Sequence, residues 1–150
     1  MNPSQVRESI LQQHADLRDQ LAELREMAVG ATPGDAAGTS ALREAGLRLL
    51  AVLESHLDFE DLHLLPALRK AGARGEERAN RVTRDHAEQR ELFHYILARL
   101  RETDRPSLLV ARQLETLVDA VLVDMADEEN TMLSADVLRD GAVGIDVETV

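Results

Sequence analysis

Apolar residues recur in alternating steps of three and four along four stretches of the chain, the pattern of helices that each bury one face. Segments rich in Gly, Pro, Ser and Thr separate these stretches at residues 30–40, 71–75 and 103–107. Ser4 or Asn2 is expected to be the N-cap of the first helix. The pattern predicts helices at about residues 4–29, 40–69, 76–102 and 106–133, and 139 is the alternative end of the last.

Four amphipathic helices joined by short connections predict an all-α fold, an antiparallel up-down-up-down four-helix bundle. We expect the bundle to occupy residues 1–140 and a loose tail or strap to occupy residues 141–150. Pro66 lies inside the second predicted helix. Because proline cannot donate the helical hydrogen bond, it should kink that helix or end its regular part.

Each of the four apolar faces is interrupted by residues that can bind a metal ion. Counted from the predicted helix ends at about 1.5 Å per residue, these interruptions lie at one depth of the bundle, to within roughly one turn. The pattern therefore predicts a single polar layer inside the core. Its members are His14 in the first helix, His56 and Glu60 in the second, His86 in the third, and Asp124 and Glu128 in the fourth.

A buried carboxylate without a partner costs several kcal/mol, so this layer requires compensation. One form is a network of hydrogen bonds among the layer residues, with Arg90 paired to Asp124 or Glu128. The other is one or two divalent cations, since imidazole nitrogen and carboxylate oxygen bind Fe, Mn or Zn. For any single residue the network is the simpler interpretation, whereas six such residues together favour metal.

The spacing within two helices suits a dinuclear site. His56 and Glu60 are four residues apart, and Asp124 and Glu128 repeat that spacing. Residues at this separation project from the same helix face and can reach one centre. Because a carboxylate can bridge two cations, each pair is suited to a site with two metals.

Composition narrows the remaining function classes. A formal charge of −11 argues against nucleic-acid binding, which needs clustered basic side chains. The chain has no cysteine, so disulfides and thiolate metal sites are excluded. No signal-peptide pattern and no apolar run of roughly 20 residues is present, so we expect a cytoplasmic protein without a membrane partner.

A second set of potential ligands competes with this assignment. Glu60 and His63 form a Glu-x-x-His pair of the kind found in ferritin-type di-iron bundles, and Glu91 and His94 repeat it. His63 is therefore an alternative ligand, while His94 is expected near the surface. Asp61 and Glu129 adjoin predicted ligands on the outer side. They are expected mainly to face solvent, and hydrogen bonding to a ligand is the alternative.

The order of these residues resembles that of hemerythrin-like, or HHE cation-binding, domains over nearly the whole chain. That family has His on the first helix, His-x3-Glu on the second, His on the third and His-x3-Glu on the fourth. The matching segments are "QQHADLRDQLAELR" with His14, "HLDFEDLHLLPAL" with His56 and Glu60, "DHAEQRELF" with His86, and "DMADEENTML" with Glu128.

Two positions depart from the family pattern. Arg90 stands where respiratory members carry a second third-helix His, and Asp124 stands where the fourth-helix His is usual. Hard anionic donors favour ferric iron, so the resemblance implies a lower redox potential and argues against reversible O2 carriage. Loss of the fourth-helix His is also expected to weaken one metal position.

The resemblance implies a non-haem di-iron protein that binds, senses or reduces O2, peroxide or NO, with Mn or Zn as alternative metals. If the site turns over, a peroxidase- or catalase-like cycle is expected, with Arg90 stabilising bound anionic oxygen. The Glu-x-x-His pairs motivate an iron-storage or ferroxidase alternative. Asp124 motivates a metal-free interaction module with a vestigial site. The sequence leaves the oligomeric state open.

Overall fold

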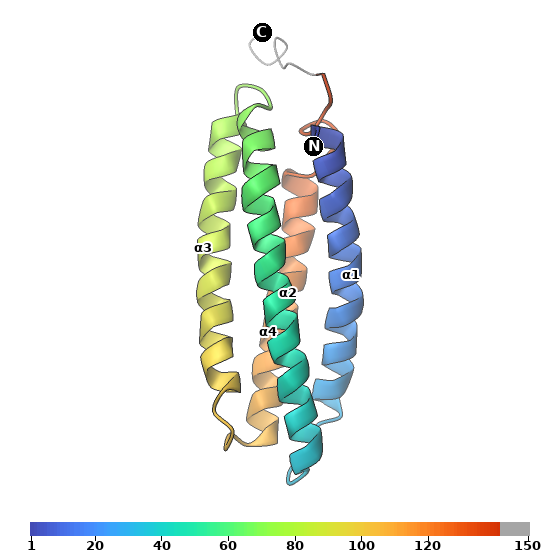
Figure 1. Ribbon diagram of the computed structural model, residues 1–150, viewed down its shortest axis with the longest axis vertical. Coiled ribbons are helices and arrows are strands. Elements are labelled where there is room, and N and C mark those ends of the chain that lie inside the picture. The colour runs from blue at the N-terminus through green and yellow to red at the C-terminus, as the bar shows by residue number, and fades with distance from the viewer. Residues whose placement is uncertain (142–150) are drawn as a thin grey trace.

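The structure is a computed structural model that describes residues 1–141, and this part of the chain contains four helices and no strand. The helices run alternately in opposite directions, so both the N-terminus and the end of the last helix lie at the same end of the molecule (Figure 1). The predicted all-α, up-down-up-down bundle is confirmed. The predicted tail lies, from residue 142 onward, outside the described residues. The helices are α1 (Pro3–Val29), α2 (Ala36–Arg69), α3 (Gly75–Leu100) and α4 (Ser107–Thr131).

Local capping explains where α1 and α2 begin. The Asn2 side chain accepts a hydrogen bond from the Gln5 backbone, and the Gln5 side chain accepts one from the Asn2 backbone, which forms a capping box. Asn2, one of the two predicted caps, is therefore the N-cap. α2 begins at Ala36 rather than near residue 40, because the Asp35 side chain accepts the backbone N–H of Gly38.

The C-terminal end of α2 agrees with its predicted range, whereas that of α4 does not. α2 does not end at Pro66 but continues to Arg69. A proline so close to the end removes one of the last helical hydrogen bonds without interrupting a long remaining segment. α4 ends at Thr131, two residues before its predicted end at 133, and residues 132–141 form turns and bends.

The helices pack around a ring in chain order. α1 and α3 each contact both α2 and α4. Across the bundle, α2 also contacts α4, whereas the described parts of α1 and α3 do not contact each other. Residues on α2 and α4 are therefore the ones that can approach each other through the centre of the bundle.

Two separate apolar clusters fill the core, and the predicted polar layer lies between them. Along α1 the layer residue His14 is flanked by Ile10 of one cluster and Leu17 of the other. Along α4, Glu128 lies between Met125 and Met132 of the two clusters. Apolar packing above and below therefore shields the layer from solvent along the bundle axis.

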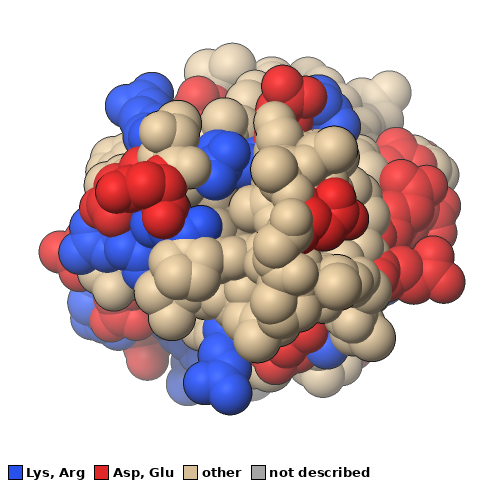
Figure 2. All heavy atoms as spheres, turned by 90° about the horizontal axis from the view of Figure 1, so that it is seen from below, with Lys and Arg blue, Asp and Glu red and all other residues tan. Residues whose placement is uncertain are grey.

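The surface carries charges of both signs. At the end of the bundle opposite the termini, acidic and basic side chains surround an uncharged centre (Figure 2). Within residues 1–141, no helix combines the length and the apolar character that crossing a membrane requires. The absence of a nucleic-acid partner and the cytoplasmic location stay predictions.

Candidate metal centre

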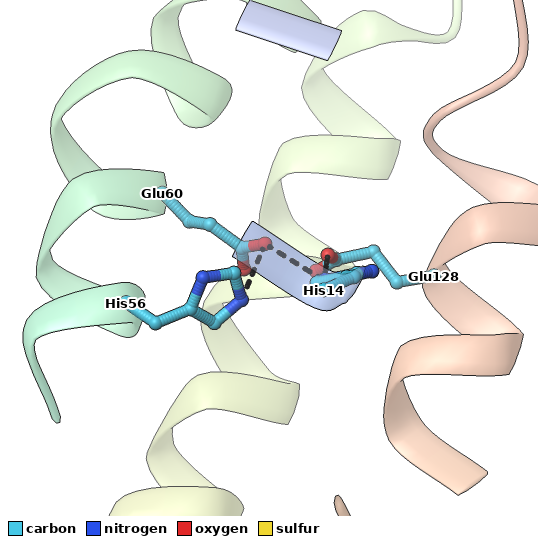
Figure 3. A group of neighbouring side chains, drawn as sticks. All are labelled: His14, His56, Glu60 and Glu128. Atoms are coloured by element: carbon cyan, nitrogen blue, oxygen red, sulfur yellow. Dashed lines mark ion pairs between the residues drawn. The ribbon is translucent and has the colours of Figure 1, made fainter. Parts of the chain in front are cut away.

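Three helices bring four of the predicted ligands into one group. His14 comes from α1, His56 and Glu60 come from α2, and Glu128 comes from α4. One donor atom from each residue lies within 4.8 Å of the other three, and the side chains point toward one another (Figure 3). We call these four residues the donor cluster. Their common depth agrees with the spacing of the sequence pattern.

Glu60 is the central residue of the site, and its two carboxylate oxygens face different imidazoles. Its Oε2 lies 3.1 Å from Nε2 of His56 and 3.8 Å from Nε2 of His14. Its Oε1 accepts a hydrogen bond of 2.8 Å from Nε2 of His86 on α3. On the far side of His14, the same Nε2 lies 3.2 Å from Oε1 of Glu128. Glu60 therefore connects the donor cluster to His86.

Three donor atoms of the cluster are buried without a hydrogen-bond partner among the described residues. They are His14 Nε2, Glu60 Oε2 and Glu128 Oε1. Buried polar atoms are nearly always satisfied, because an unsatisfied one keeps its full desolvation cost. Three such atoms converging on one point are what a cation would satisfy. The residues present therefore fit a metal bound by nitrogen and oxygen.

The outer nitrogen of His14 is held by an ion-paired carboxylate. His14 Nδ1 donates to Oε2 of Glu129 at 2.7 Å. Arg18 in turn donates two hydrogen bonds to Glu129, at 2.8 and 3.0 Å. A histidine that donates through Nδ1 presents Nε2 as its metal-binding atom. This chain of contacts therefore orients His14 toward the cluster.

The two other imidazoles are held in the same way. His56 Nδ1 donates to Oε1 of Gln13 at 2.6 Å, and His86 Nδ1 donates to Oδ1 of Asp61 at 2.7 Å. Arg90 donates to the second oxygen of Asp61, also at 2.7 Å. All three inward-facing histidines thus have an acceptor on the outer nitrogen, as metal-ligating histidines almost always do.

Two of these acceptors were expected mainly to face solvent. Asp61 and Glu129 do not mainly face solvent, because each accepts a hydrogen bond from a histidine of the layer. Gln13 was not singled out at all. Helical spacing could not predict this contact, because Gln13 lies next to His14 on α1 and its partner His56 lies on α2.

Charges at the centre are strongly coupled. Burial disfavours the charged form of His14, but its contacts with Glu128, Glu60 and Glu129 outweigh burial and raise its pKa from 6.5 to about 10. Burial and the neighbouring Glu60 raise the pKa of Glu128 well above its ordinary value. Despite its own burial, the contacts of Glu60 with Glu128 and the histidines lower its pKa well below the usual range. Without a cation, protons on His14 and Glu128 therefore offset the negative charge.

Asp124 lies beside the donor cluster without belonging to it. It lines the same small cavity as Glu60 and Glu128, but it is not among the four residues whose donor atoms lie within 4.8 Å of one another. Burial and the nearby carboxylates of Asp85 and Asp127, with Glu88, raise its pKa from 3.8 to about 6. Asp124 as a metal ligand stays a prediction.

The remaining candidates lie away from the cavity. Arg90 contacts Asp58 and Asp61 on α2, and the residues that line the cavity do not include it. His63 lines a different cavity of about 540 Å3 near the termini, and its ring lies 4.5 Å from that of Phe59. His94 is exposed and lies 3.3 Å from Glu54. The second residue of each Glu-x-x-His pair therefore points away from the donor cluster.

A small cavity of about 20 Å3 adjoins the donor cluster, and we call it the site cavity. A space of roughly 10–15 Å3 is enough for one water-sized molecule. Its polar walls are the donor cluster, Gln89 and Asp124. Its apolar walls are Leu17, Leu53, Leu57, Phe93, Val121 and Met125.

Comparison with known proteins agrees with this geometry. The family model described as "Hemerythrin HHE cation binding domain" matches residues 5–135. The match includes every residue of the donor cluster, together with His86, Asp124 and the acceptors of the three histidines. Neither the curated proteins nor the solved structures include a significant match to this chain.

Proposed function

This chain belongs to the hemerythrin HHE cation-binding domain family, and we propose that it holds a non-haem di-iron centre that binds, senses or reduces a small oxidant. The oxidant would be O2, peroxide or NO. Cation binding itself has direct support from the family match and from the donor cluster. The choice of iron and of the oxidant goes beyond that support and is the substance of the proposal.

The single observation that carries the proposal is the set of three unsatisfied donor atoms on His14, Glu60 and Glu128. Without a cation, these buried atoms would have to stay unpaired or be satisfied by protonation of the side chains. Nitrogen and carboxylate donors without thiolate suit Fe, Mn or Zn rather than softer metals. Iron, when bound, would supply one-electron redox chemistry and an open position for a small ligand.

We propose two metal positions of unequal strength. The first would use the donor cluster, with Glu60 contributing Oε2. The second would use His86 and the other oxygen of Glu60, which face each other at 2.8 Å. Asp124 is the nearest further carboxylate that lines the site cavity. Because the second position has fewer donors, we expect it to bind its ion more weakly.

The other residues of the chain orient the ligands and exclude water. Glu129, Gln13 and Asp61 hold the three imidazoles so that each Nε2 faces inward. The apolar walls and the small volume of the site cavity admit a water-sized or diatomic molecule and little else. Arg90 acts in this proposal by positioning His86 through Asp61, instead of contacting a bound anion.

Metal analysis combined with an optical spectrum tests the proposal. After aerobic purification or reconstitution with ferrous iron, we expect about two irons per chain at saturation, as in other carboxylate-bridged helix bundles. The spectrum should change on addition of O2, peroxide or NO. His56→Ala should lower the iron content, whereas the matched variant His63→Ala, on the same helix but away from the cluster, should retain it.

Two results would contradict the proposal. Absence of any bound metal after reconstitution would leave a metal-free interaction module. Iron uptake far beyond two per chain, lost in His63→Ala, would instead indicate storage through the Glu-x-x-His pairs.

A further inference from the structure

A surface groove between α2 and α3 approaches the metal centre from outside. It has a volume of about 380 Å3, and we call it the α2–α3 groove. Leu50 and Ala51 of α2 and Leu97 of α3 contribute apolar side chains to its walls. Glu54 and His94, which lie 3.3 Å apart, form the polar part of its lining together with Arg101, while its other five lining residues are apolar. An uncharged apolar molecule is therefore better suited to this groove than an ion.

Phe93 is the one described residue that lines both the α2–α3 groove and the site cavity. Its side chain is 2% exposed and belongs to the larger apolar cluster of the core. Phe93 therefore separates the groove from the cavity. A path between the two spaces at this point requires its side chain to move.

We propose that Phe93 controls access to the metal centre, and that an uncharged diatomic molecule, O2 or NO, enters through the α2–α3 groove. The inference rests on the proposed function for the identity of the ligand, and it narrows that function from small oxidants to apolar diatomic gases. Phe93 is not a catalytic residue in this role, since its side chain carries no atom that could bind a metal and acts only on passage between the two spaces.

Xenon binding tests, without any metal, whether Phe93 keeps the groove and the site cavity separate. Xenon is an apolar atom that occupies dry protein cavities. Leu50 and Leu97 line only the groove, whereas Leu53 and Val121 line only the site cavity. In metal-free wild-type protein under xenon pressure, we expect the methyl NMR signals of Leu50 and Leu97 to shift and those of Leu53 and Val121 to stay unchanged. In Phe93→Ala, the methyl signals of all four residues should shift with the same dependence on xenon pressure, because the two spaces are joined.

Leu97→Ala is the matched control. It also removes bulk from an apolar side chain of α3, but it enlarges only the groove. It should strengthen the response of the Leu50 methyl groups, the groove reporter that this variant retains, and leave the methyl groups of Leu53 and Val121 unchanged. Phe93→Leu retains more volume than Phe93→Ala and gives the same test with less risk of unfolding. Helical circular dichroism verifies that each variant is folded.

Ligand entry is measured in the iron-loaded protein. Stopped-flow mixing of the reduced protein with O2 or NO should give a faster spectral change in Phe93→Ala, by about tenfold if the ring accounts for about 1.4 kcal/mol of the entry barrier. Leu97→Ala should match wild type.

The inference is overturned if the cavity methyl groups of Phe93→Ala and Phe93→Leu do not respond to xenon, or if Leu97→Ala joins the two spaces equally well. It is also overturned if wild-type protein shows xenon at both sets of methyl groups, because the ring then separates nothing. A wild-type protein that binds no iron or reacts with neither gas would defeat the proposed function instead. The xenon result would still decide whether Phe93 separates the groove from the site cavity.

Discussion

Glu60 of α2 and His86 of α3 face each other at 2.8 Å inside the bundle, although they are 26 residues apart in the chain. The other oxygen of Glu60 faces His56 at 3.1 Å and His14 at 3.8 Å. One carboxylate therefore joins imidazoles from three helices. Its removal should affect every part of the centre, and this makes Glu60 the most informative position for mutation.

Glu60→Gln keeps the size of the side chain and removes its negative charge. We expect iron binding to be largely lost. In metal-free protein, the pKa of His86 should fall below its wild-type value, because contact with Glu60 is the main influence that raises it against burial. NMR titration of the imidazoles measures this pKa. Glu44→Gln, which removes a charge from α2 outside the site, should leave both properties unchanged.

Metal binding should release protons. His14 has a pKa of about 10, so it carries a proton at neutral pH in the metal-free protein. A metal ligand must be neutral imidazole, so binding has to displace about one proton from His14. Calorimetric titration in buffers of different ionisation enthalpy counts the protons released. His14→Ala should release fewer, and equal release from both proteins would contradict the raised pKa.

Glu129→Ala should weaken metal binding by about 10–100-fold, because Glu129 holds the outer nitrogen of His14. The Arg18–Glu129 pair links α1 and α4, and so does the exposed pair formed by Arg25 and Asp119 at 2.6 Å. Asp119→Ala is therefore the matched control for loss of an ion pair between these helices, and it should leave metal affinity unchanged. Competition with a chelator of known affinity provides the measurement.

Asp124→Asn should raise the stability of the metal-free protein near neutral pH. The folded-state pKa of Asp124 is about 6, above its ordinary 3.8, so the folded state holds this proton more tightly than the unfolded state. Below the ordinary pKa of 3.8, Asp124 is protonated in both states and has no effect on the free energy of unfolding. As the pH rises from there toward 6, Asp124 lowers the free energy of unfolding. Urea denaturation with chelator present should show that the variant is more stable than wild type above about pH 6, and that this difference disappears near pH 4.

Asp19→Asn, at an exposed carboxyl of α1, gives the baseline effect of removing one negative charge from an acidic protein. An advantage of Asp124→Asn that persists unchanged to pH 4 would show that its origin is not the titration of this carboxyl. The iron content of the same variant reports separately on Asp124 as a ligand.

The four helices were predictable because their signal is local. The apolar steps of three and four belong to each helix alone, and capping residues such as Asn2 act within a few positions. The predicted start of α2 near residue 40 was wrong, because residues 30–40 are rich in Gly and Thr and have the composition of a loop. Asp35 nevertheless caps a helix there, and the glycine at 38 is accommodated in its first turn.

The inward-facing donors were also accessible to sequence reasoning, since a polar residue on an apolar helix face must be buried. The histidine that each outer acceptor contacts was not. Asp61 follows Glu60 on α2 but accepts from His86 of α3. Likewise, Glu129 follows Glu128 on α4 but accepts from His14 of α1. A residue adjacent to an inward donor is turned about 100° around its helix, toward a neighbouring helix.

Helical periodicity alone thus established four buried faces, each with a polar break at a shared depth, and a donor chemistry of nitrogen and oxygen. Tertiary structure decided which donors meet, that Glu60 shares its two oxygens between different histidines, and that His63 points elsewhere. The physical reason is that periodicity depends only on rotation about one helix axis. Contacts between helices depend on how all four axes are rotated and placed relative to one another, and packing of the two apolar clusters sets that arrangement.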